Sequence, residues 1–495
     1  MSRLDELNSW HSDWKGLRAV VFGLGVSGFS VADTLAELGS DVLVLAEKAE
    51  PELLDILDVL GVPHLTGVSN SELLERAKSF SPELIVTSPG IRPQNELLGW
   101  AGEQGIPIWV DIDLAWRLRD KTEKLADWFM VTGTNGKTTT CQMLEAMLNQ
   151  GGLRAIACGN IGTPILDAIR DPMGFDALVV ELSSFQLHYL NPGISPVSAA
   201  VLNLADDHLD WHGGFDAYGK AKAKIFENTK VACVYNVGDN ATMKMVEDAE
   251  VEEGARAIGF TLGTPGLSQI GYVEDILCDR AFVDDRQNNA QLLATFEDLE
   301  QIGVLTPHLM ANAAAAAAMA RSAGIDAEDI QVALRNFKLD GHRIQLVRDA
   351  NGVRWFDDSK ATNPHAAAAS LASFDSVIWV VGGLLKGVDI APLVERYAKR
   401  LKAVLVIGVD RAPVLEALKQ HAAEVPVEEI APADGSALMD QVVARAAFFA
   451  RPGDAVLLAP AAASMDQFKD YADRGNQFVA AVAKYFANDA AQREG

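Results

Sequence analysis

Short apolar runs alternate with longer amphipathic stretches along the chain. In the first third, this pattern predicts strands at residues 18–22, 41–45 and 84–87, with a helix at 28–38 between the first two. The same pattern predicts later strands at residues 128–131, 177–180, 199–202, 231–235, 353–356, 377–381, 403–407 and 455–458. Because strands that alternate with helices pair as parallel sheets, the sequence predicts an α/β fold.

The predicted strands and helices fall into three series, and 495 residues are too many for a single hydrophobic core. We therefore predict three domains, at residues 1–110, 111–339 and 340–495. The alanine-rich residues 312–323 are expected to form a helix that packs closely on a neighbour. A charged helix is expected at residues 466–474.

A glycine-rich turn joins the predicted strand at 128–131 to a predicted helix at 138–150. Its sequence is Val131-Thr-Gly-Thr-Asn-Gly-Lys-Thr138. The N–H groups of such a turn, with the positive end of the following helix, bind phosphate groups. We expect Lys137 to reach the outer phosphates of a nucleoside triphosphate and the Thr138 hydroxyl to bind Mg²⁺. Val131 stands where the general pattern has its first glycine, so this is a shorter form of the loop.

A second glycine-rich turn, Gly23-Leu-Gly-Val-Ser-Gly28, follows the first predicted strand, and Glu47 ends the next one. By itself this pattern is typical of a dinucleotide-binding turn, which would make the protein a nicotinamide-dependent oxidoreductase. The alternative is a tight turn that only packs a helix on a strand.

In the middle of the chain, polar residues follow the ends of predicted strands. Glu181 is placed to contact Mg²⁺, because hard cations prefer oxygen ligands. Residues 206–210, Asp-Asp-His-Leu-Asp, form either a metal site or a solvated acidic loop. Three lysines at a spacing of two, Lys220, Lys222 and Lys224, cannot share one helical face, so one or two of them at most point inward.

The last third has a similar loop at residues 357–364, Asp-Asp-Ser-Lys-Ala-Thr-Asn-Pro, after a predicted strand. α/β proteins place ligands at such strand ends. Arg343 lies at the predicted boundary between the second and third domains, where a guanidinium group could bind a nucleotide phosphate on domain closure.

The net charge is -26, which argues against a nucleic-acid partner, because binding phosphate backbones needs a basic surface. The four cysteines show neither disulfide nor metal spacing, so we expect reduced thiols in the cytoplasm. The polar start and the lack of a long apolar run predict no signal peptide and no insertion into a membrane.

Taken together, these segments resemble the Mur ligases, and most closely the D-glutamate-adding branch of that family. The phosphate loop is shared with sister enzymes such as folylpolyglutamate synthases. More specific motifs are G-L-G-x-S-G at 23, S-P-G-I at 88, G-N-I-G at 159, E-L-S-S-F-Q-L at 181, D-S-K-A-T-N at 358 and D-Q-F-K at 466. The resemblance covers nearly the whole chain in order.

The resemblance implies a Rossmann-like N-terminal domain, a central P-loop ATPase-like domain and a Rossmann-like C-terminal domain. It also implies an ATP-dependent ligase of peptidoglycan precursor synthesis, which joins D-glutamate to UDP-N-acetylmuramoyl-L-alanine through an acyl phosphate. ATP, two Mg²⁺ ions and these small-molecule substrates are the expected partners, and a monomer is expected.

The resemblance also implies roles for individual residues. The catalytic residues would be Lys137, Glu181, His208 and Lys222, with Thr138, Glu181, His208 and a carbamylated Lys222 as metal ligands. ATP would contact Gly133, Thr134, Asn135, Gly136, Lys137, Thr138, Thr139, Asn312, Arg343, Asp358 and Lys360. The UDP-sugar would contact Gly25, Val26, Ser27, Gly90 and Asn160. D-Glutamate would contact Thr362, Lys386, Ser464 and Tyr471. Lys222 is selected because it follows Tyr218 by four residues, as in the family's Tyr-x-x-x-Lys pattern.

Some positions depart from the family pattern. Leu309 replaces a second Asn, Leu384 replaces an Asp, Ala459 and Ala462 replace Ser and Cys, and Ala46-Glu-Lys48 differs from the usual acid-x-base. Alternatives are another Mur ligase or a folylpolyglutamate synthase-like ligase. The complete domain before the phosphate loop disfavours the folate enzyme, and the lack of a D-N-P-R motif disfavours the diaminopimelate-adding one.

Overall fold

The structure is a computed structural model, and it describes residues 3–339, 341–431 and 435–494. The chain divides into two compact units, each described here by itself. The first contains residues 1–204, 216–298 and 311–337, and the second contains residues 205–215, 299–310 and 338–495. In the part of the chain that is described, no helix is both long and apolar enough to cross a membrane.

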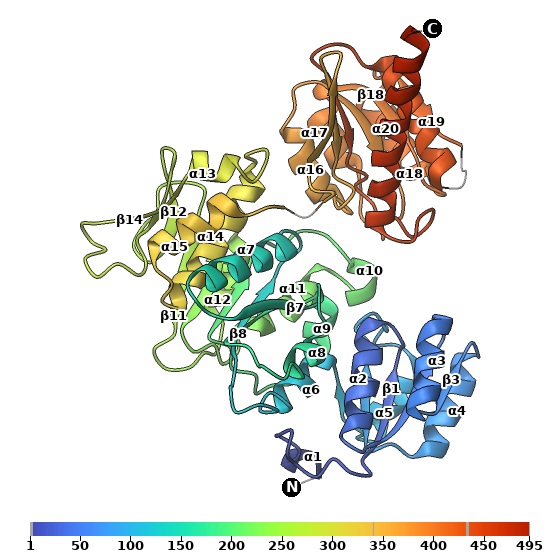
Figure 1. Cartoon of the computed structure of the whole chain (residues 1–495). Helices are drawn as coiled ribbons and strands as arrows, with labels where there is room; N and C mark the ends of the chain where they lie inside the picture. Colours follow the sequence, from blue (N-terminus) through green and yellow to red (C-terminus); the bar gives the residue numbers. More distant parts are fainter. Residues whose placement is uncertain (1–2, 340, 432–434, 495) are drawn as a thin grey trace. The chain divides into compact units, whose positions relative to one another are not determined.

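The first sheet is a five-stranded parallel sheet in the order β3-β2-β1-β4-β5. It belongs to the part of the chain drawn in blue in Figure 1. Its strands are β1 (Arg18–Phe22), β2 (Asp41–Ala46), β3 (His64–Thr66), β4 (Leu84–Thr87) and β5 (Ile108–Trp109). The helices of this region are α1 (Arg3–Glu6), α2 (Val26–Glu37), α3 (Pro51–Leu60), α4 (Asn70–Phe80) and α5 (Glu96–Glu103). The strand order reverses between β1 and β4, which is where ligands bind in sheets of this kind.

The second sheet has nine strands in the order β14-β13-β12-β11-β10-β9-β6-β8-β7. They are β6 (Asp127–Thr132), β7 (Ala155–Gly159), β8 (Ala177–Glu181), β9 (Ser198–Val201), β10 (Ala232–Asn236), β11 (Arg256–Phe260), β12 (Gln269–Val273), β13 (Ile276–Asp279) and β14 (Gln291–Thr295). β13 pairs antiparallel with β12 and β14, and the other pairs are parallel. β6 therefore lies between β8 and β9, and the loops that follow all three strands meet at one edge.

The helices between residues 111 and 336 follow these strands. They are α6 (Asp111–Arg117), α7 (Lys137–Gln150), α8 (Ile165–Ile169), α9 (Ser184–Tyr189), α10 (Leu209–His212), α11 (Phe215–Ala223), the 3₁₀ turn η1 (Lys224–Phe226), α12 (Asn240–Glu247), α13 (Phe296–Glu300), α14 (Pro307–Ser322) and α15 (Ala327–Asn336). Alanines 313–318 and Ala320 of α14 are fully buried, as expected for a helix that packs closely on its neighbours.

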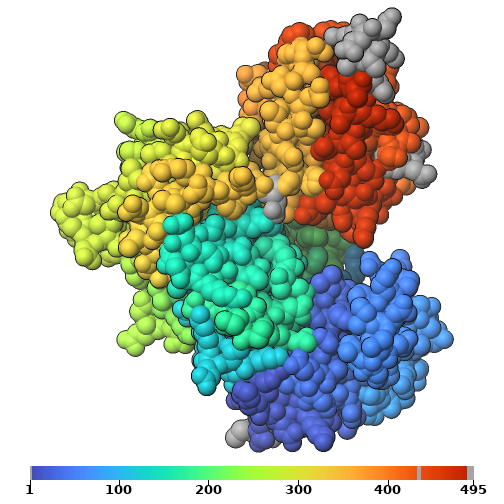
Figure 2. All heavy atoms as spheres, in the orientation of Figure 1, coloured from blue at the N-terminus to red at the C-terminus, as the bar shows by residue number. Residues whose placement is uncertain are grey.

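The third sheet has six strands in the order β15-β16-β20-β17-β18-β19, of which only β15 is antiparallel to its neighbour. The strands are β15 (Gln345–Ala350), β16 (Val353–Asp357), β17 (Val377–Val381), β18 (Leu401–Val406), β19 (Val427–Glu429) and β20 (Ala455–Leu458). The helices are α16 (Pro364–Ala372), α17 (Ala391–Tyr397), η2 (Ala398–Arg400), α18 (Ala412–His421), α19 (Gly435–Phe449) and α20 (Tyr471–Glu494). In the space-filling view, α20 lies on the outside of this domain (Figure 2).

The predicted α/β fold with three sheets is confirmed, and most predicted strands are correct to within two residues at each end. The helix predicted at 466–474 is wrong, because α20 begins only at Tyr471. Before it, Asp466 and Gln467 accept hydrogen bonds from the N–H groups of Val409 and Gly408, which holds the segment as a turn. The sequence also gave no indication of β11 to β14. The predicted start of the third domain, Asp340, lies outside the described residues, and the domain boundaries stay a prediction.

Candidate functional site

The turn between β6 and α7 has the backbone that a phosphate-binding loop needs. Gly133 and Gly136 have φ angles of 158° and 85°, and Gly136 caps α7 in the left-handed region. A Cβ at Gly136 would also collide with the side-chain oxygen of Asn312. Glycine is therefore required at 136 both by conformation and by space, and Asn312 of α14 lies directly against the loop.

Polar side chains hold this loop in shape. Lys137 donates from Nζ to the carbonyl oxygens of Gly133 and Thr134, both at 3.0 Å. Asn203, just after β9, accepts from the Asn135 N–H at 2.9 Å and donates to its carbonyl at 3.0 Å. Thr138 and Thr139 are 8% and 2% exposed. Sequence reasoning missed Asn203, although its position at the end of a strand beside β6 could have indicated it.

Glu181, the last residue of β8, is 2% exposed and is held by Asn160. The Asn160 side-chain amide donates to Glu181 Oε1 at 2.9 Å. The other oxygen, Oε2, is buried and accepts no hydrogen bond within the described residues. A buried carboxylate oxygen without a donor is a costly arrangement that a bound cation would relieve, so this position fits a Mg²⁺ ligand. Two residues predicted to have different roles, Asn160 and Glu181, are thus in contact.

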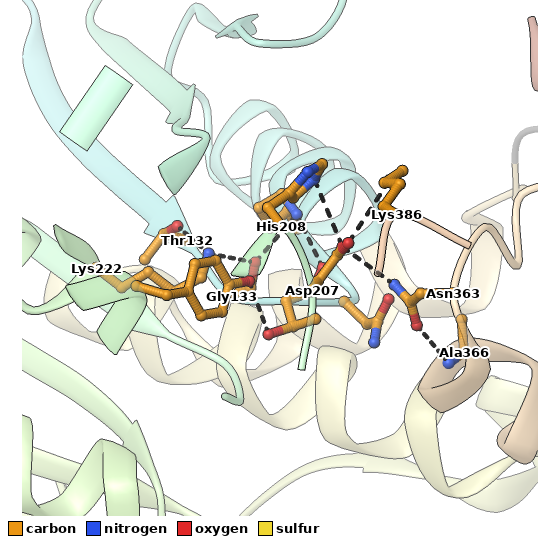
Figure 3. A network of polar contacts seen from close by, with 12 residues as sticks. Thr132, Gly133, Asp207, His208, Lys222, Asn363, Ala366 and Lys386 are labelled. Atoms are coloured by element: carbon orange, nitrogen blue, oxygen red, sulfur yellow. Dashed lines mark hydrogen bonds and ion pairs between the residues drawn. The ribbon is translucent and has the colours of Figure 1, made fainter. Parts of the chain in front are cut away.

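Lys222 points into the protein under the phosphate loop (Figure 3). It is 2% exposed, and its Nζ donates to the Gly133 carbonyl at 2.8 Å and to Thr132 Oγ1 at 3.3 Å. Tyr218, one turn earlier on α11, has its hydroxyl 3.0 Å from Thr134 Oγ1. Lys222 is therefore one of the lysines that point inward.

The two neighbouring lysines differ from Lys222. Lys220 is exposed, while half-buried Lys224 donates to the carbonyls of His188 and Leu190. Among the three, Lys222 alone reaches the phosphate loop by a hydrogen bond that the structure defines. The resemblance and the geometry therefore favour the same lysine.

His208 belongs to the second unit, whereas Thr138, Glu181 and Lys222 belong to the first. It has a φ angle of 54° and caps the short α10, and its Nε2 lies 3.6 Å from Asp207 Oδ2. Among the described residues, no three His, Cys, Asp or Glu side chains gather into a group that could hold a metal ion. The four predicted metal ligands stay a prediction as a set.

A cavity of about 740 Å³ lies at the carboxyl ends of β1 and β4 in the first unit. The predicted UDP-sugar residues Gly25, Val26, Ser27 and Gly90 all line it. The Ser27 side chain also hydrogen-bonds to Asp111, whose pKa is raised by burial. The first turn of α2 opens into this cavity, so its N–H groups are available to an anionic ligand.

In the second unit, three loops at the carboxyl ends of β16, β17 and β20 are joined to one another. Leu384 and Ala463 exchange two backbone hydrogen bonds of 2.9 Å, which places the Lys386 loop beside the Ser464 loop. Arg474, 1% exposed, donates to the carbonyls of Ala462 and Ser359 at 3.1 and 2.8 Å. Burial lowers the pKa of Arg474 to about 10. Sequence reasoning gave this arginine no role.

Two predicted nucleotide residues of this unit, Asp358 and Lys360, lie on the loop after β16, and the charge of Arg343 lies near Asp358. Burial raises the pKa of Asp358 to about 7, against the effects of hydrogen bonds from Ser370 and the Ile344 N–H and of the nearby Arg343 charge. His342 Nδ1 lies 2.6 Å from Oδ2 of the fully buried Asp357, and this hydrogen bond raises the pKa of His342.

Of the four residues predicted to bind D-glutamate, Thr362, Lys386 and Ser464 lie on the loops after β16, β17 and β20, and Tyr471 begins α20. Lys360 Nζ lies 4.9 Å from the centre of the Tyr471 ring, and the Ser359 hydroxyl donates to the Tyr471 carbonyl at 2.7 Å. Thr362 follows in the same loop, where its N–H donates to the Lys360 carbonyl. Ser464 is 3% exposed and accepts backbone hydrogen bonds from Gln467 and Phe468, and Lys386 pairs with Asp207.

The departures from the family pattern occupy contrasting environments. Leu309, Ala459 and Ala462 are buried, so a polar side chain at any of them would need a partner inside the protein. Leu384 is instead 42% exposed beside the Lys386 loop. The Ala459 carbonyl accepts from Trp379 Nε1 at 2.8 Å, so that backbone position is held by a buried tryptophan.

Three family models match the chain in sequence order. They are the Mur ligase MurD-like N-terminal domain at residues 17–110, the Mur ligase middle domain at 131–320 and the Mur ligase glutamate ligase domain at 342–462. The matches follow the three sheets.

Curated relatives resemble the chain over nearly its whole length. The UDP-N-acetylmuramoylalanine–D-glutamate ligase of Leifsonia xyli subsp. xyli is 56% identical, with 99% of this chain and 96% of the relative covered. The enzyme of the same name from Streptomyces coelicolor is 50% identical, over 95% and 98% of the two chains.

Solved structures share the fold at lower identity. UDP-N-acetylmuramate-alanine ligase MurC from Thermotoga maritima superposes with a TM-score of 0.54 at 18% identity, over 95% of this chain and 99% of that one. MurF ligase from the same organism, solved in complex with ADP, superposes with a TM-score of 0.54 at 19% identity, over 90% of this chain and 95% of that one.

Proposed function

The chain belongs to the Mur ligase family, and we propose that it is the ATP-dependent ligase that joins D-glutamate to UDP-N-acetylmuramoyl-L-alanine in peptidoglycan precursor synthesis. The observation that carries this proposal is the 56% identity to a D-glutamate ligase over 99% of the chain. The specific motifs lie on loops at the ends of parallel strands in all three sheets, which supports the same proposal.

The reaction has two chemical steps. The γ-phosphoryl group of ATP passes to the L-alanyl carboxylate, which gives an acyl phosphate and ADP. The amine of D-glutamate then attacks the acyl carbon, and inorganic phosphate leaves from the tetrahedral intermediate. Positioning and charge stabilisation account for most of the catalysis in such phosphoryl transfers.

The loop at 133–139 and Asn312 would bind ATP. The N–H groups at the start of α7 would donate to the phosphate oxygens, and Lys137 would exchange its loop carbonyls for the outer phosphates. In the second unit, Arg343, Asp358 and Lys360 would contact the nucleotide. The loop at 133–139 follows the carboxyl end of β6, and Asp358 and Lys360 follow that of β16, which supports this assignment.

Mg²⁺ ions, when bound, neutralise the phosphate charge that develops in the transition state. Thr138 and Glu181 are suited to hold them, because Glu181 Oε2 is buried without a hydrogen-bond donor. Lys222 as an amine offers only donors, so it would be a ligand only after carbamylation had turned it into an oxygen donor. His208 would complete the set.

The cavity at the ends of β1 and β4 would bind the uridine diphosphate portion of the substrate, and Asn160 would approach its sugar-linked end. The cavity is large enough for a nucleotide, and glycines at its wall let a diphosphate approach the backbone. Thr362, Lys386, Ser464 and Tyr471 would bind D-glutamate in the second unit.

The proposal also includes a location in the cytoplasm and a monomeric state. The four free, buried cysteines agree with a reducing compartment.

An amino-acid panel tests the proposal. Purified protein is supplied with ATP, Mg²⁺ and UDP-N-acetylmuramoyl-L-alanine, and ADP and phosphate release is measured with each amino acid. We expect release with D-glutamate and none when any substrate is omitted. Release with meso-diaminopimelate or lysine, but not D-glutamate, would refute the proposed specificity and favour a sister ligase. Binding of NAD(P)H would favour the oxidoreductase alternative.

A further inference from the structure

The buried carboxylate of Asp207 has no assigned role, and it lies beside the predicted D-glutamate lysine. Asp207 follows β9 in the segment 205–215, which belongs to the second unit together with Lys386 and Asn363. It is 6% exposed, and its Oδ1 lies 3.6 Å from Lys386 Nζ (Figure 3). Burying the Asp207 carboxylate costs free energy, which the nearby charge of half-buried Lys386 partly offsets.

The two carboxylate oxygens of Asp207 have different contacts. Oδ2 lies 3.4 Å from the side-chain amide of Asn363, which donates to it, and 3.6 Å from His208 Nε2. Asn363 is itself fixed, because its side-chain oxygen caps α16 by accepting from the Ala366 N–H at 2.8 Å. Oδ1 is buried and accepts no hydrogen bond within the described residues. One oxygen is therefore held in place and the other remains able to accept a hydrogen bond.

The Asp207–Lys386 pair is an ion pair without a hydrogen bond between its partners. A separation of 3.6 Å keeps opposite charges close and leaves room for hydrogen bonds from each to a third group. Lys386 has a φ angle of 55°, so its own backbone turns sharply within this loop. The result is a fixed negative acceptor next to a positive donor.

An amino acid presents the complementary arrangement. Its α-carboxylate and α-ammonium group are attached to the same carbon, so a positive and a negative charge lie a few ångströms apart. A carboxylate facing the ammonium and an ammonium facing the carboxylate satisfy both ends of this zwitterion. A dicarboxylic acid without the amine would satisfy only the lysine.

We propose that Asp207 and Lys386 together recognise the zwitterionic head of the amino-acid substrate, with Asp207 Oδ1 accepting a hydrogen bond from its α-nitrogen. Lys386 binds the adjacent carboxylate. Asp207 thereby orients the nitrogen that forms the new amide bond, and it selects substrates that carry an amine. This inference rests on the proposed ligase function and adds the residue that recognises the nucleophile.

Glutarate, which is glutamate without its amine, separates amine recognition from general damage. In Asp207→Asn, the KM for D-glutamate should rise about 10- to 100-fold, as expected when a charge-assisted hydrogen bond is lost. The inhibition constant of glutarate should stay within about threefold of the wild-type value, because glutarate makes no contact with Asp207. Lys386→Gln should weaken D-glutamate and glutarate alike.

The matched control is Asp206→Asn, which removes the same charge from the exposed neighbouring side chain. In Asp206→Asn, the ratio of the KM for D-glutamate to the inhibition constant of glutarate should stay at the wild-type value. The melting temperature of each variant, compared with that of the wild-type protein, reports whether it folds. If Asp207→Asn is unstable, the same ratio is measured for Asp207→Ser. An equal change for D-glutamate and glutarate in the Asp207 variants, or no change for either, would overturn the proposal.

Failure of this inference is distinguishable from failure of the proposed function. The amino-acid panel on wild-type protein identifies the amino-acid substrate independently of Asp207. If that substrate is not D-glutamate, the same ratio is measured with the amino acid found and its analogue without the amine. A ratio unaffected by Asp207→Asn then rejects the role of Asp207, whatever the substrate.

Discussion

At the scale of single residues, Lys222 shows how burial distinguishes side chains that look alike in sequence. Lys220, Lys222 and Lys224 are spaced by two residues, and a helix turns by 200° over that interval. Lys222 is 2% exposed and contacts the phosphate loop, while Lys220 is exposed. Keeping an amine buried there costs free energy, which supports a chemical role for it.

Replacing Lys222 tests whether that role is to supply an anionic oxygen. Lys222→Ala should lower kcat/KM by at least about 100-fold, because one predicted Mg²⁺ ligand and its charge are lost. A small carboxylic acid added to the assay should restore part of the activity by filling the space with an oxygen ligand. Lys220→Ala, on the exposed side of α11, is the matched control and should retain wild-type kcat/KM. Full activity of Lys222→Ala would refute the carbamate hypothesis.

At the scale of elements, the glycines of the first turn fix how a helix sits on a strand. A Cβ at Gly28 in α2 would collide with the Gly23 carbonyl, which follows β1. Gly28 does not have a left-handed φ angle, so space and not backbone conformation requires glycine. The close approach of α2 to β1 directs the start of the helix into the neighbouring cavity.

Gly28→Ala tests this packing. Overpacking should destabilise the first domain by about 1–3 kcal/mol. It should also raise the KM for the UDP-sugar more than the KM for ATP, because the start of α2 moves. Gly99→Ala in α5 is the matched control, since a Cβ there meets no atom within 4 Å. It should stabilise the protein by up to about 1 kcal/mol. Unfolding in denaturant and steady-state kinetics give both quantities, and equal KM changes for the two substrates would contradict this explanation.

At the scale of the whole molecule, the hydrophobic cores do not correspond to the three sheets with one core for each sheet. One hydrophobic cluster of the first unit runs from Leu4 through the first sheet to Met130 of the second sheet and Met245 of α12. α6 packs against both α2 and α8, and Arg170 at the end of α8 binds Asp33 and Glu37 of α2 at 2.5 and 2.9 Å. The first two domains therefore share a core, while the third sheet has its own clusters.

The shared core predicts that the first two domains lose structure together. Leu114→Ala removes a fully buried side chain from α6 and should destabilise the first unit by about 2–5 kcal/mol. Hydrogen exchange followed by mass spectrometry should show protection falling in both β1 and β6. Leu405→Ala in β18, equally buried, is the matched control and should affect the third sheet instead. Loss of protection in β1 but not β6 for Leu114→Ala would argue against a shared core.

The sequence by itself determined the local features of this protein. Alternating apolar runs predicted the central strands of all three sheets, because a buried parallel strand must be apolar on both faces, but they did not predict β11 to β14. The glycines at 133 and 136 predicted a phosphate loop, because few other residues adopt its backbone. The strand-end motifs predicted where ligands would bind, because parallel strands bring their carboxyl ends to one edge.

Only the tertiary structure decided which distant side chains meet. The contacts of Asn203 with the phosphate loop, of Arg474 with two strand-end loops and of Asp207 with Lys386 join residues far apart in sequence. The turn at residues 466–470 was predicted as part of a helix because its stabilising partners, Gly408 and Val409, lie on another loop. Sequence patterns report the preferences of neighbouring residues, whereas burial and long-range pairing depend on how the whole chain packs.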